Sequence, residues 1–328
     1  MFVFEYNHTN YDQLVQDYAR QLGVPVINNK FIFPRNIAIG FMQAVDLQSR
    51  LQAIIFDYTF TDKYIGKRKK STEEYYTLWF NEITIEEGAT IEIETEQYKP
   101  SQTSFSAVLL TSTLFDAVFE AEKGTRIFGI NILLSKEWLA DHLGVNDDSE
   151  LLRKYLSLKA SRITLEPIDA EYKKLINEII NLVQGDEQFK QIAVQNRIML
   201  LIERFFMRMA LKMQDEKNNV RLSREDINRV MQVEALLTKD VFKLPPFISD
   251  LAKMVHVSET KLKKNFKSVY GFPIYHYYQK ARMHVAKEVL ETQRYSIKQI
   301  AQEMGYSNLS NFTIAFKKEF GMLPSELQ

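Results

Sequence analysis

A segment of twelve residues occurs twice in the last third of the chain. SNFTIAFKKEFG (310–321) repeats the pattern of TKLKKNFKSVYG (260–271), with phenylalanine seventh, lysine eighth and glycine twelfth in both. The residues before each copy also match, at an offset of 49: Ile248, Leu251, Ala252, Val257 and Ser258 with Ile297, Ile300, Ala301, Tyr306 and Ser307. Each copy predicts a short amphipathic helix, a four-residue turn, a serine N-cap and a second helix that ends at glycine. This arrangement is a helix-turn-helix.

The turn and cap residues of the two copies favour the same interpretation. Gly305 stands where the turn of the second copy needs a positive φ, and His256, a residue type that tolerates this conformation, takes that place in the first copy. Ser296 and Gln299 have the spacing of a capping box. They are therefore predicted to begin the first helix of the second copy.

The segment between the copies, about Ile274 to Gln293, predicts one long helix. Its apolar stripe consists of Ile274, Tyr278, Ala281, Val285 and Val289. A helix of about twenty residues is about 30 Å long, and one turn of B-DNA is about 34 Å. Two second helices held that far apart would enter successive major grooves on one face of a duplex. We therefore expect the two copies to bind double-stranded DNA.

Residues of the second helices that lie off the apolar stripes are the candidate DNA contacts. Lysines hold phosphates or donate to guanine, whereas Ser and Thr read bases weakly and an aliphatic side chain touches only a thymine methyl. The second copy is therefore expected to contribute more to holding the DNA than to recognising its base sequence. A solvated, lysine-rich helix is the alternative interpretation. The candidates are Ser258, Thr260, Lys261, Lys263, Lys264 and Lys267 in the first copy and Ser307, Leu309, Ser310, Thr313, Ile314, Lys317 and Lys318 in the second.

The charge of the chain is distributed unevenly. The formal net charge is zero, but residues 221–328 carry 17 Lys and Arg against 11 Asp and Glu, a net charge of +6, and residues 1–220 carry 25 against 31, a net charge of −6. A basic C-terminal third indicates an anionic partner for that part of the chain.

The N-terminal part has the texture of β-structure from Lys30 to about Leu134. Short runs rich in β-branched and aromatic residues, such as LQAIIFDYTF and RIFGINILL, are separated by turn-like pairs such as Glu87-Gly88 and Lys123-Gly124. About seven or eight such strands predict a sandwich or barrel. Helical patterns are found at 10–22, after Ser135 in SKEWLADHLG, and at 168–184 and 188–213.

The predicted fold class is α+β, in four segments. A β-rich domain covers 1–160, a helical dimerisation region covers 161–214, a polar linker covers 215–224, and an all-α domain with two helix-turn-helix units covers 225–328. The broad apolar stripe of 188–213 predicts packing in a bundle or at a dimer interface. Leu201 and Phe205 are the candidate dimer contacts, and packing on the chain's own barrel is the alternative.

The C-terminal third resembles the AraC/XylS family of bacterial transcription regulators. SIKQIAQEMGYSNLSNFTIAFKKEFGMLPSEL is close to that family's signature, and LAKMVHVSETKLKKNFKSVYGFPIYHYYQKARMHVAKEVL is similar to its first unit and linker helix. The resemblance implies base contacts from Thr260, Lys263, Lys264, Leu309, Ser310, Thr313 and Ile314, although family members often have a basic residue where Ile314 stands. It also implies RNA polymerase as a partner and a cupin-like N-terminal domain that binds a small-molecule effector and dimerises through the helices that follow.

Aromatic residues are dense in two of the predicted strands of the N-terminal part. Tyr58, Phe60, Tyr75 and Trp79 are therefore candidates to line an apolar pocket for an effector. Ordinary filling of the barrel core is the alternative interpretation for each of them.

Several kinds of chemistry lack the residues that they need. The chain has no cysteine, which excludes disulfides, thiolate metal sites and the methyl-accepting repair chemistry of some relatives. The N-terminal half has only His8 and His142, so a catalytic metal centre of the cupin type is not expected. GKRKKST (66–72) lacks the upstream glycine of a phosphate loop and is interpreted as a basic hairpin loop. We expect no metal, no cofactor and no enzymatic activity.

These patterns predict a sequence-specific, homodimeric transcription regulator controlled by a small-molecule effector. The first alternative is a regulator whose N-terminal part only dimerises or binds a partner protein, and the second is an enzyme with a DNA-binding appendage. No run of residues is long and apolar enough for a membrane helix, and the N-terminus does not resemble a signal peptide, so a cytoplasmic location is expected. The effector, the operator and the sign of regulation do not follow from these patterns.

Overall fold

The structure is a computed structural model that describes residues 1–7, 9–47, 51–86, 88–93, 96–98, 104–144, 166–185, 188–214 and 222–327. It contains two compact units. Unit 1 comprises Met1–Ile168 and Leu175–Asn219, and unit 2 comprises Asp169–Lys174 and Val220–Gln328. Most of the predicted linker at 215–224 lies outside the described residues. The mixed α+β class, with a β-rich N-terminal part and a helical C-terminal part, is confirmed.

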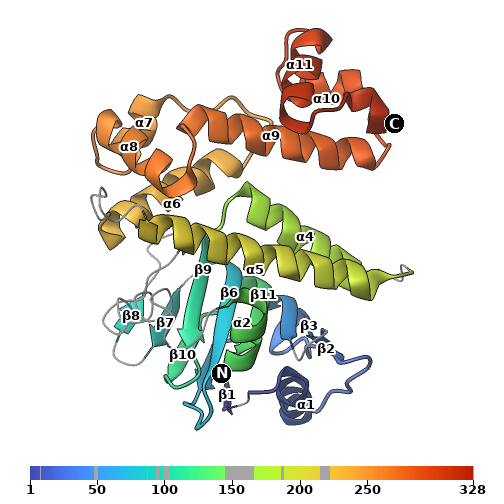
Figure 1. The fold of residues 1–328 in the computed structure, drawn as a ribbon, viewed down its shortest axis with the longest axis vertical. Coiled ribbons are helices and arrows are strands. Elements are labelled where there is room, and N and C mark those ends of the chain that lie inside the picture. Colours follow the sequence, from blue (N-terminus) through green and yellow to red (C-terminus); the bar gives the residue numbers. More distant parts are fainter. Residues whose placement is uncertain are drawn as a thin grey trace. The chain divides into compact units, whose positions relative to one another are not determined.

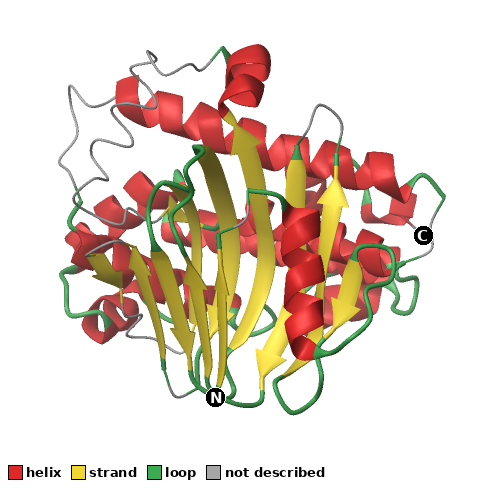
Figure 2. Cartoon of the chain, turned by 90° about the horizontal axis from the view of Figure 1, so that it is seen from below, coloured by secondary structure: helices red, strands yellow, loops and turns green. Residues whose placement is uncertain are grey.

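Unit 1 is built on two sheets, whose strands lie side by side in curved layers (Figure 2). The smaller sheet has the order β1 (Phe2–Tyr6), β5 (Tyr64–Arg68), β10 (Ala117–Ala121), β7 (Ala89–Ile93) and β8 (Glu96–Tyr98). The larger sheet has the order β12 (Glu166–Pro167), β9 (Ser104–Ser112), β6 (Tyr75–Thr84), β11 (Arg126–Ser135), β4 (Gln52–Phe60), β3 (Ala38–Asp46) and β2 (Lys30–Ile32). Strands β1 and β5 are parallel, and the other described pairs are antiparallel.

Besides the three-residue β8, three strands of the smaller sheet were not predicted, namely β1, β5 and β10. Each has only five residues, so alternation over them is weak. The interpretation of residues 66–72 as a hairpin loop was wrong for the first three of them, because Gly66 to Arg68 belong to β5. Tyr64, Gly66 and Arg68 are buried on one face of that strand, so Arg68 points into the protein.

The helices predicted at 10–22, after Ser135, at 168–184 and at 188–213 are found in the structure. Helix α1 (Tyr11–Leu22) ends at Gly23, and α2 (Lys136–Leu143) begins at the N-cap Ser135 and ends at Gly144, whose φ is 63°. Helices α4 (Ala170–Gln184) and α5 (Lys190–Gln214) follow. No helix in the described ranges has the length and apolar character needed to cross a membrane.

The predicted dimer contacts on α5 are corrected by the structure. Leu201 and Phe205 are both 0% exposed, because they face the interior of the chain. The opposite side of α5 carries exposed apolar side chains instead, at Leu200 (39% exposed), Met207 (58%) and Leu211 (62%). The sequence pattern of a broad apolar stripe does not show which of its residues are buried within the same chain and which remain exposed.

Unit 2 contains the duplicated helices. Its elements are α6 (Arg224–Thr238), α7 (Ile248–Met254), α8 (Glu259–Tyr270), α9 (Ile274–Glu291), α10 (Ile297–Glu303), α11 (Leu309–Phe320) and the short 3₁₀ helix η3 (Pro324–Leu327). Helix α9 runs from the α7–α8 pair to the α10–α11 pair (Figure 1). Leu262 and Phe266 belong to the core of the first pair, and Phe312 and Phe316 belong to a separate core in the second.

The predicted turns and caps of the two pairs are confirmed, with one exception. His256 and Gly305 have φ of 54° and 70°, and Ser296 and Gln299 form the capping box. Ser258 caps α8 by accepting a hydrogen bond from the backbone N–H of Lys261. The N-cap of α11 is Asn308 and not the predicted Ser307, because the second turn is one residue longer and the Asn308 side chain accepts from the Asn311 N–H at 2.8 Å.

The first turn of α4 belongs to unit 2. In this unit, Lys173 Nζ lies 2.9 Å from Glu234 Oε1, and the Tyr277 hydroxyl donates to the same oxygen at 2.9 Å. Glu234 is a buried carboxylate of α6. A buried carboxylate needs such partners because desolvation of an unpaired charge is costly.

Candidate nucleic-acid interface and internal cavity

Helix α8 presents four exposed lysines, but they are not equivalent. Lys261 forms an ion pair with Asp226 at 2.8 Å, and Lys263 forms one with Glu259 at 3.2 Å. Lys264 and Lys267 are exposed and have no ion-pair partner within the described ranges. Thr260 and the cap residue Ser258 are exposed beside them. Lys264 and Lys267 are therefore the side chains of α8 most available to a phosphate or a base edge.

The partner of Lys261 is a fixed charge on α6. The hydrogen bond from Lys261 lowers the pKa of the Asp226 carboxyl below its usual value, and Ser223 and Arg229 act in the same direction. Asp226 therefore stays ionised at neutral pH and offsets the charge of Lys261. Because of this ion pair, Lys261 should contribute less to DNA binding than its exposed position on α8 predicts.

Helix α11 presents a less basic surface. Ile314 is 67% exposed, and Leu309 and Ser310 are also exposed. The Thr313 hydroxyl donates to the Leu309 carbonyl at 2.9 Å, so its proton is already used. Lys317 and Lys318 are exposed near the helix end, and Ser307 is exposed before the N-cap.

Asn311 is an exposed residue of α11 that the sequence analysis did not select. Asparagine can pair with both hydrogen-bonding groups of adenine in the major groove. Its position between Ser310 and the buried Phe312, in the first turn of the helix, could have identified it as a candidate DNA contact from the sequence.

A buried arginine joins the two helix-turn-helix units. Arg282 of α9 donates through Nε to the Val241 carbonyl at 3.0 Å, and through a terminal nitrogen to the Met304 carbonyl. Its guanidinium lies 5.5 Å from the centre of the Tyr278 ring and 5.4 Å from that of Tyr306. Val241 precedes the first unit and Met304 lies in the turn of the second. Arg282 therefore holds the two units in one orientation on α9.

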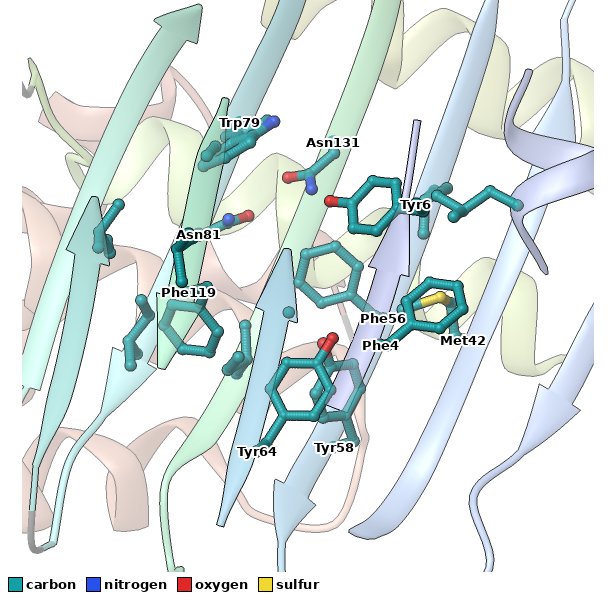
Figure 3. Close-up of a pocket in the computed structure, with 18 of the residues that line it drawn as sticks. Phe4, Tyr6, Met42, Phe56, Tyr58, Tyr64, Trp79, Asn81, Phe119 and Asn131 are labelled. Carbon is teal, nitrogen blue, oxygen red and sulfur yellow. The ribbon is translucent and has the colours of Figure 1, made fainter. Parts of the chain in front are cut away.

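Unit 1 contains an internal cavity of about 120 Å³ between its two sheets. The side chains around it come from β1, α1, β3, β4, β5, β6, β7, β9, β10 and β11, and Figure 3 labels ten of them. Of the predicted effector-binding residues, Tyr58 and Trp79 line the cavity. Phe60 is buried in the core next to it, and Tyr75 lies at the start of β6, away from the lining.

Known proteins are similar to parts of this chain. Residues 251–328 match a family model described as a helix-turn-helix domain. The probable transcriptional regulator LumQ of Photobacterium leiognathi is 25% identical over 163 residues, which cover 49% of this chain and 61% of LumQ. A probable AraC family transcriptional regulator from Rhodopseudomonas palustris CGA009 is 25% identical, with a TM-score of 0.28, over 30% of this chain and 94% of that one. The C-terminal part of this chain is a helix-turn-helix domain of the AraC type.

One solved structure is similar over more of the chain than the AraC-type domain. Unsaturated-fatty-acid-bound ToxT from Vibrio cholerae strain SCE256 aligns with 84% of this chain and 94% of its own length, at 16% identity and a TM-score of 0.30. A likeness at this level says nothing about the function of this chain. The chain spans about 61% of the length of LumQ, so the activity of the whole protein is a matter of proposal.

We expect the two recognition helices of the AraC-type domain to contribute unequally to DNA binding. Lys264→Ala should weaken operator binding by about 1–3 kcal/mol and relax sequence preference, because it removes an unpaired donor of the kind that reads guanine. Ile314→Ala should cost less than about 1 kcal/mol, because only a methyl contact is lost. Quantitative gel-shift titrations of both variants on one operator measure the difference.

The matched control for Lys264→Ala is Lys239→Ala, which removes the same charge from an exposed position outside α8. It should change affinity little. If Ile314→Ala were the more damaging variant, α11 would be the main reading helix and this assignment would be wrong.

Proposed function

We propose that the chain is a transcription regulator that binds double-stranded DNA at specific sites. The observation that carries this proposal is the pair of helix-turn-helix units joined by α9, each with exposed lysines on its second helix. The match to an AraC-type domain and the likeness to LumQ support it. RNA polymerase is a proposed partner on the strength of the family alone, and a cytoplasmic location follows from action on chromosomal DNA.

Genomic footprinting tests this proposal. Full-length protein should protect discrete sites upstream of genes, and protection should be lost when Lys264 and Lys267 are both changed to alanine. Uniform, sequence-independent protection would contradict a specific regulator.

We further propose that unit 1 senses a small-molecule effector in its internal cavity, as a cupin-like sensor domain would. The cavity and its aromatic walls support this role. The alternative is that unit 1 serves only for assembly or for binding a partner protein. An effector that shifts both the thermal unfolding of the chain and its operator affinity supports sensing, whereas assembly alone predicts neither shift.

We also propose that the regulator is a homodimer through the exposed side of α5. Leu200, Met207 and Leu211 are spaced at i, i+7 and i+11, which places them on one helical face. Changing all three to glutamine should give a folded monomer, because the apolar contact is lost while the chain's own core is untouched. Sedimentation and circular dichroism measure assembly and folding separately.

Leu201→Gln is the contrasting control for the dimer, because this residue is fully buried in the chain. It should unfold unit 1 and not merely dissociate it. Wild-type protein that sediments as a monomer at tens of micromolar, with and without DNA, would refute the dimer.

A further inference from the structure

We propose that the cavity of unit 1 takes an uncharged molecule the size of one aromatic ring, carrying one hydrogen-bonding group. This inference rests on the sensing role proposed above and adds the chemical class of the ligand. The size, the walls, the polar groups and the charge of the cavity each point to this class.

The size of the cavity sets the first condition. Its volume is about 120 Å³. An apolar protein cavity of about 150 Å³ holds benzene, so a slightly smaller cavity accepts at most about one ring. A nucleotide or a long acyl chain requires considerably more space.

Aromatic side chains form much of the wall. Figure 3 shows Phe4, Phe56, Tyr58, Tyr64 and Phe119 around the cavity. A Cβ on Gly66 would lie 2.6 Å from the Tyr64 hydroxyl, so glycine at this position lets the Tyr64 ring lie over β5. Aromatic rings favour another ring in edge or offset contact.

Two amides supply the hydrogen-bonding groups. Asn81 of β6 and Asn131 of β11 both line the cavity, and the Oδ1 atom of each is buried without a hydrogen-bond partner. The strands are paired so that Asn131 lies opposite Trp79, and Asn81 lies opposite Gly129. A Cβ on Gly129 would come within 2.8 Å of the Asn81 Oδ1, so this glycine makes room for the amide.

Unpaired buried acceptors are costly, at about 1–3 kcal/mol each, and they persist where a water or a ligand completes them. Two such amides on neighbouring strands of one cavity therefore indicate a ligand with a hydroxyl or amide group. Figure 3 shows Asn131 and Tyr6 on the same side of the cavity as Trp79.

The uncharged lining of the cavity favours a ligand without charge. The residues that line it are all uncharged. The nearby Arg68 is not among them: its guanidinium packs on the Trp79 ring at 5.5 Å and donates to the Thr77 hydroxyl and the Ser112 carbonyl, each at 3.0 Å. Burial raises the pKa of Tyr6, which does line the cavity, so its hydroxyl is neutral at pH 7. A carboxylate would find no cation among the residues that line the cavity; the Arg68 Nε, which is buried without a hydrogen-bond partner, is the nearby donor that tighter binding of benzoate would implicate.

Two matched pairs of probes test the class with full-length protein at pH 7. Toluene and p-cresol differ by a hydroxyl, and benzamide and benzoate differ by a charge. Dissociation constants from ligand-observed NMR should show p-cresol binding about 3- to 10-fold more tightly than toluene, the gain of one hydrogen bond. Benzamide should bind at least about 10-fold more tightly than benzoate.

Asn131→Leu, which keeps the number and branching of the side-chain heavy atoms, tests the role of the amide. It should reduce the advantage of p-cresol over toluene to less than about 2-fold while leaving toluene binding unchanged. It should also raise the unfolding temperature of the ligand-free chain, because an unpaired buried acceptor is removed. Asn36→Leu, at an exposed turn position in unit 1, should leave all four affinities unchanged.

The other outcomes separate failure of this inference from failure of the sensing role. Equal binding of toluene and p-cresol would mean that the amides face only water. This result would overturn the proposal that the ligand carries a hydrogen-bonding group. Tighter binding of benzoate would overturn the uncharged class and leave the sensing role intact. Absence of binding by all four probes would contradict the ligand class and also favour the assembly role for unit 1, while operator binding, measured in parallel, would still report on the DNA-binding function.

Discussion

Operator affinity of the full-length chain should fall by about 100-fold for each bound DNA-binding domain when the salt concentration rises from 50 to 200 mM. Lys264, Lys267, Lys317 and Lys318 are exposed and have no ion-pair partner among the described residues, so each can neutralise one phosphate. Four neutralised phosphates give a slope of roughly −3.6 in log affinity against log salt, because condensed counterions are released from the duplex. The measurement is a series of fluorescence-anisotropy titrations on one operator.

Two variants bracket the salt prediction. Changing the four lysines to alanine should flatten the slope, because no counterions are then released by these positions. Asp226→Asn should make the slope steeper by up to about 1, because it frees Lys261 from its ion pair at 2.8 Å. A flat slope for the wild-type chain would contradict phosphate binding by this surface.

The fragment 221–328 should also bind DNA with the same slope per bound domain, but it should be less stable than unit 2 in the full chain. The fragment lacks Lys173, which pairs with the buried Glu234 in the intact protein. Its basic surface, in contrast, is complete. Salt dependence is therefore the property to compare between the fragment and the full chain, and not absolute affinity.

Arg282→Met should lower the stability of unit 2 by about 2–5 kcal/mol. The substitution removes the hydrogen bonds to the Val241 and Met304 carbonyls; the Met304 carbonyl loses its side-chain donor, while the Val241 carbonyl keeps the Tyr278 hydroxyl at 3.2 Å. It also removes the cation between the Tyr278 and Tyr306 rings. Because these contacts join the two helix-turn-helix units, binding should become more tolerant of changes in the spacing between the two half-sites.

The two tryptophans of the chain make the Arg282 prediction measurable. Both lie in unit 1, at Trp79 and Trp138, so tryptophan fluorescence follows the unfolding of that unit. Arg282→Met should lower the urea midpoint of the helical circular dichroism signal and leave the fluorescence midpoint unchanged. Arg294→Met, which removes an exposed arginine near the end of α9, is the matched control and should change neither midpoint. Equal shifts of both signals would mean that the two units unfold together.

The sequence by itself determined the features that depend on neighbours along the chain. The duplicated helices, the capping box at Ser296 and the positive φ at His256 and Gly305 follow from local preferences of glycine, serine and histidine. The β texture of the N-terminal part and the helix between Ser135 and Gly144 follow from periodicity and cap residues. These preferences act over a few residues, so a single chain displays them directly.

Only the tertiary structure decided which side chains meet across the fold. Lys261 is neutralised by Asp226 of another helix, while its neighbour Lys264 is not. Arg68 looked like part of a basic loop and is buried, because a five-residue strand is defined by its partners β1 and β10 more than by its own pattern. Leu201 and Phe205 are buried, whereas the adjacent Leu200 faces another side of the same helix and is exposed.

The cavity of unit 1 shows most clearly the difference between what local sequence indicates and what the tertiary structure decides. Tyr58 and Trp79 were found by aromatic density, but nothing local marks Asn81 and Asn131 as its polar groups. Both are ordinary strand residues until β6 pairs with β11 and the second sheet encloses them. The free energy of an unpaired buried amide depends on what surrounds it, and residues distant in sequence provide those surroundings.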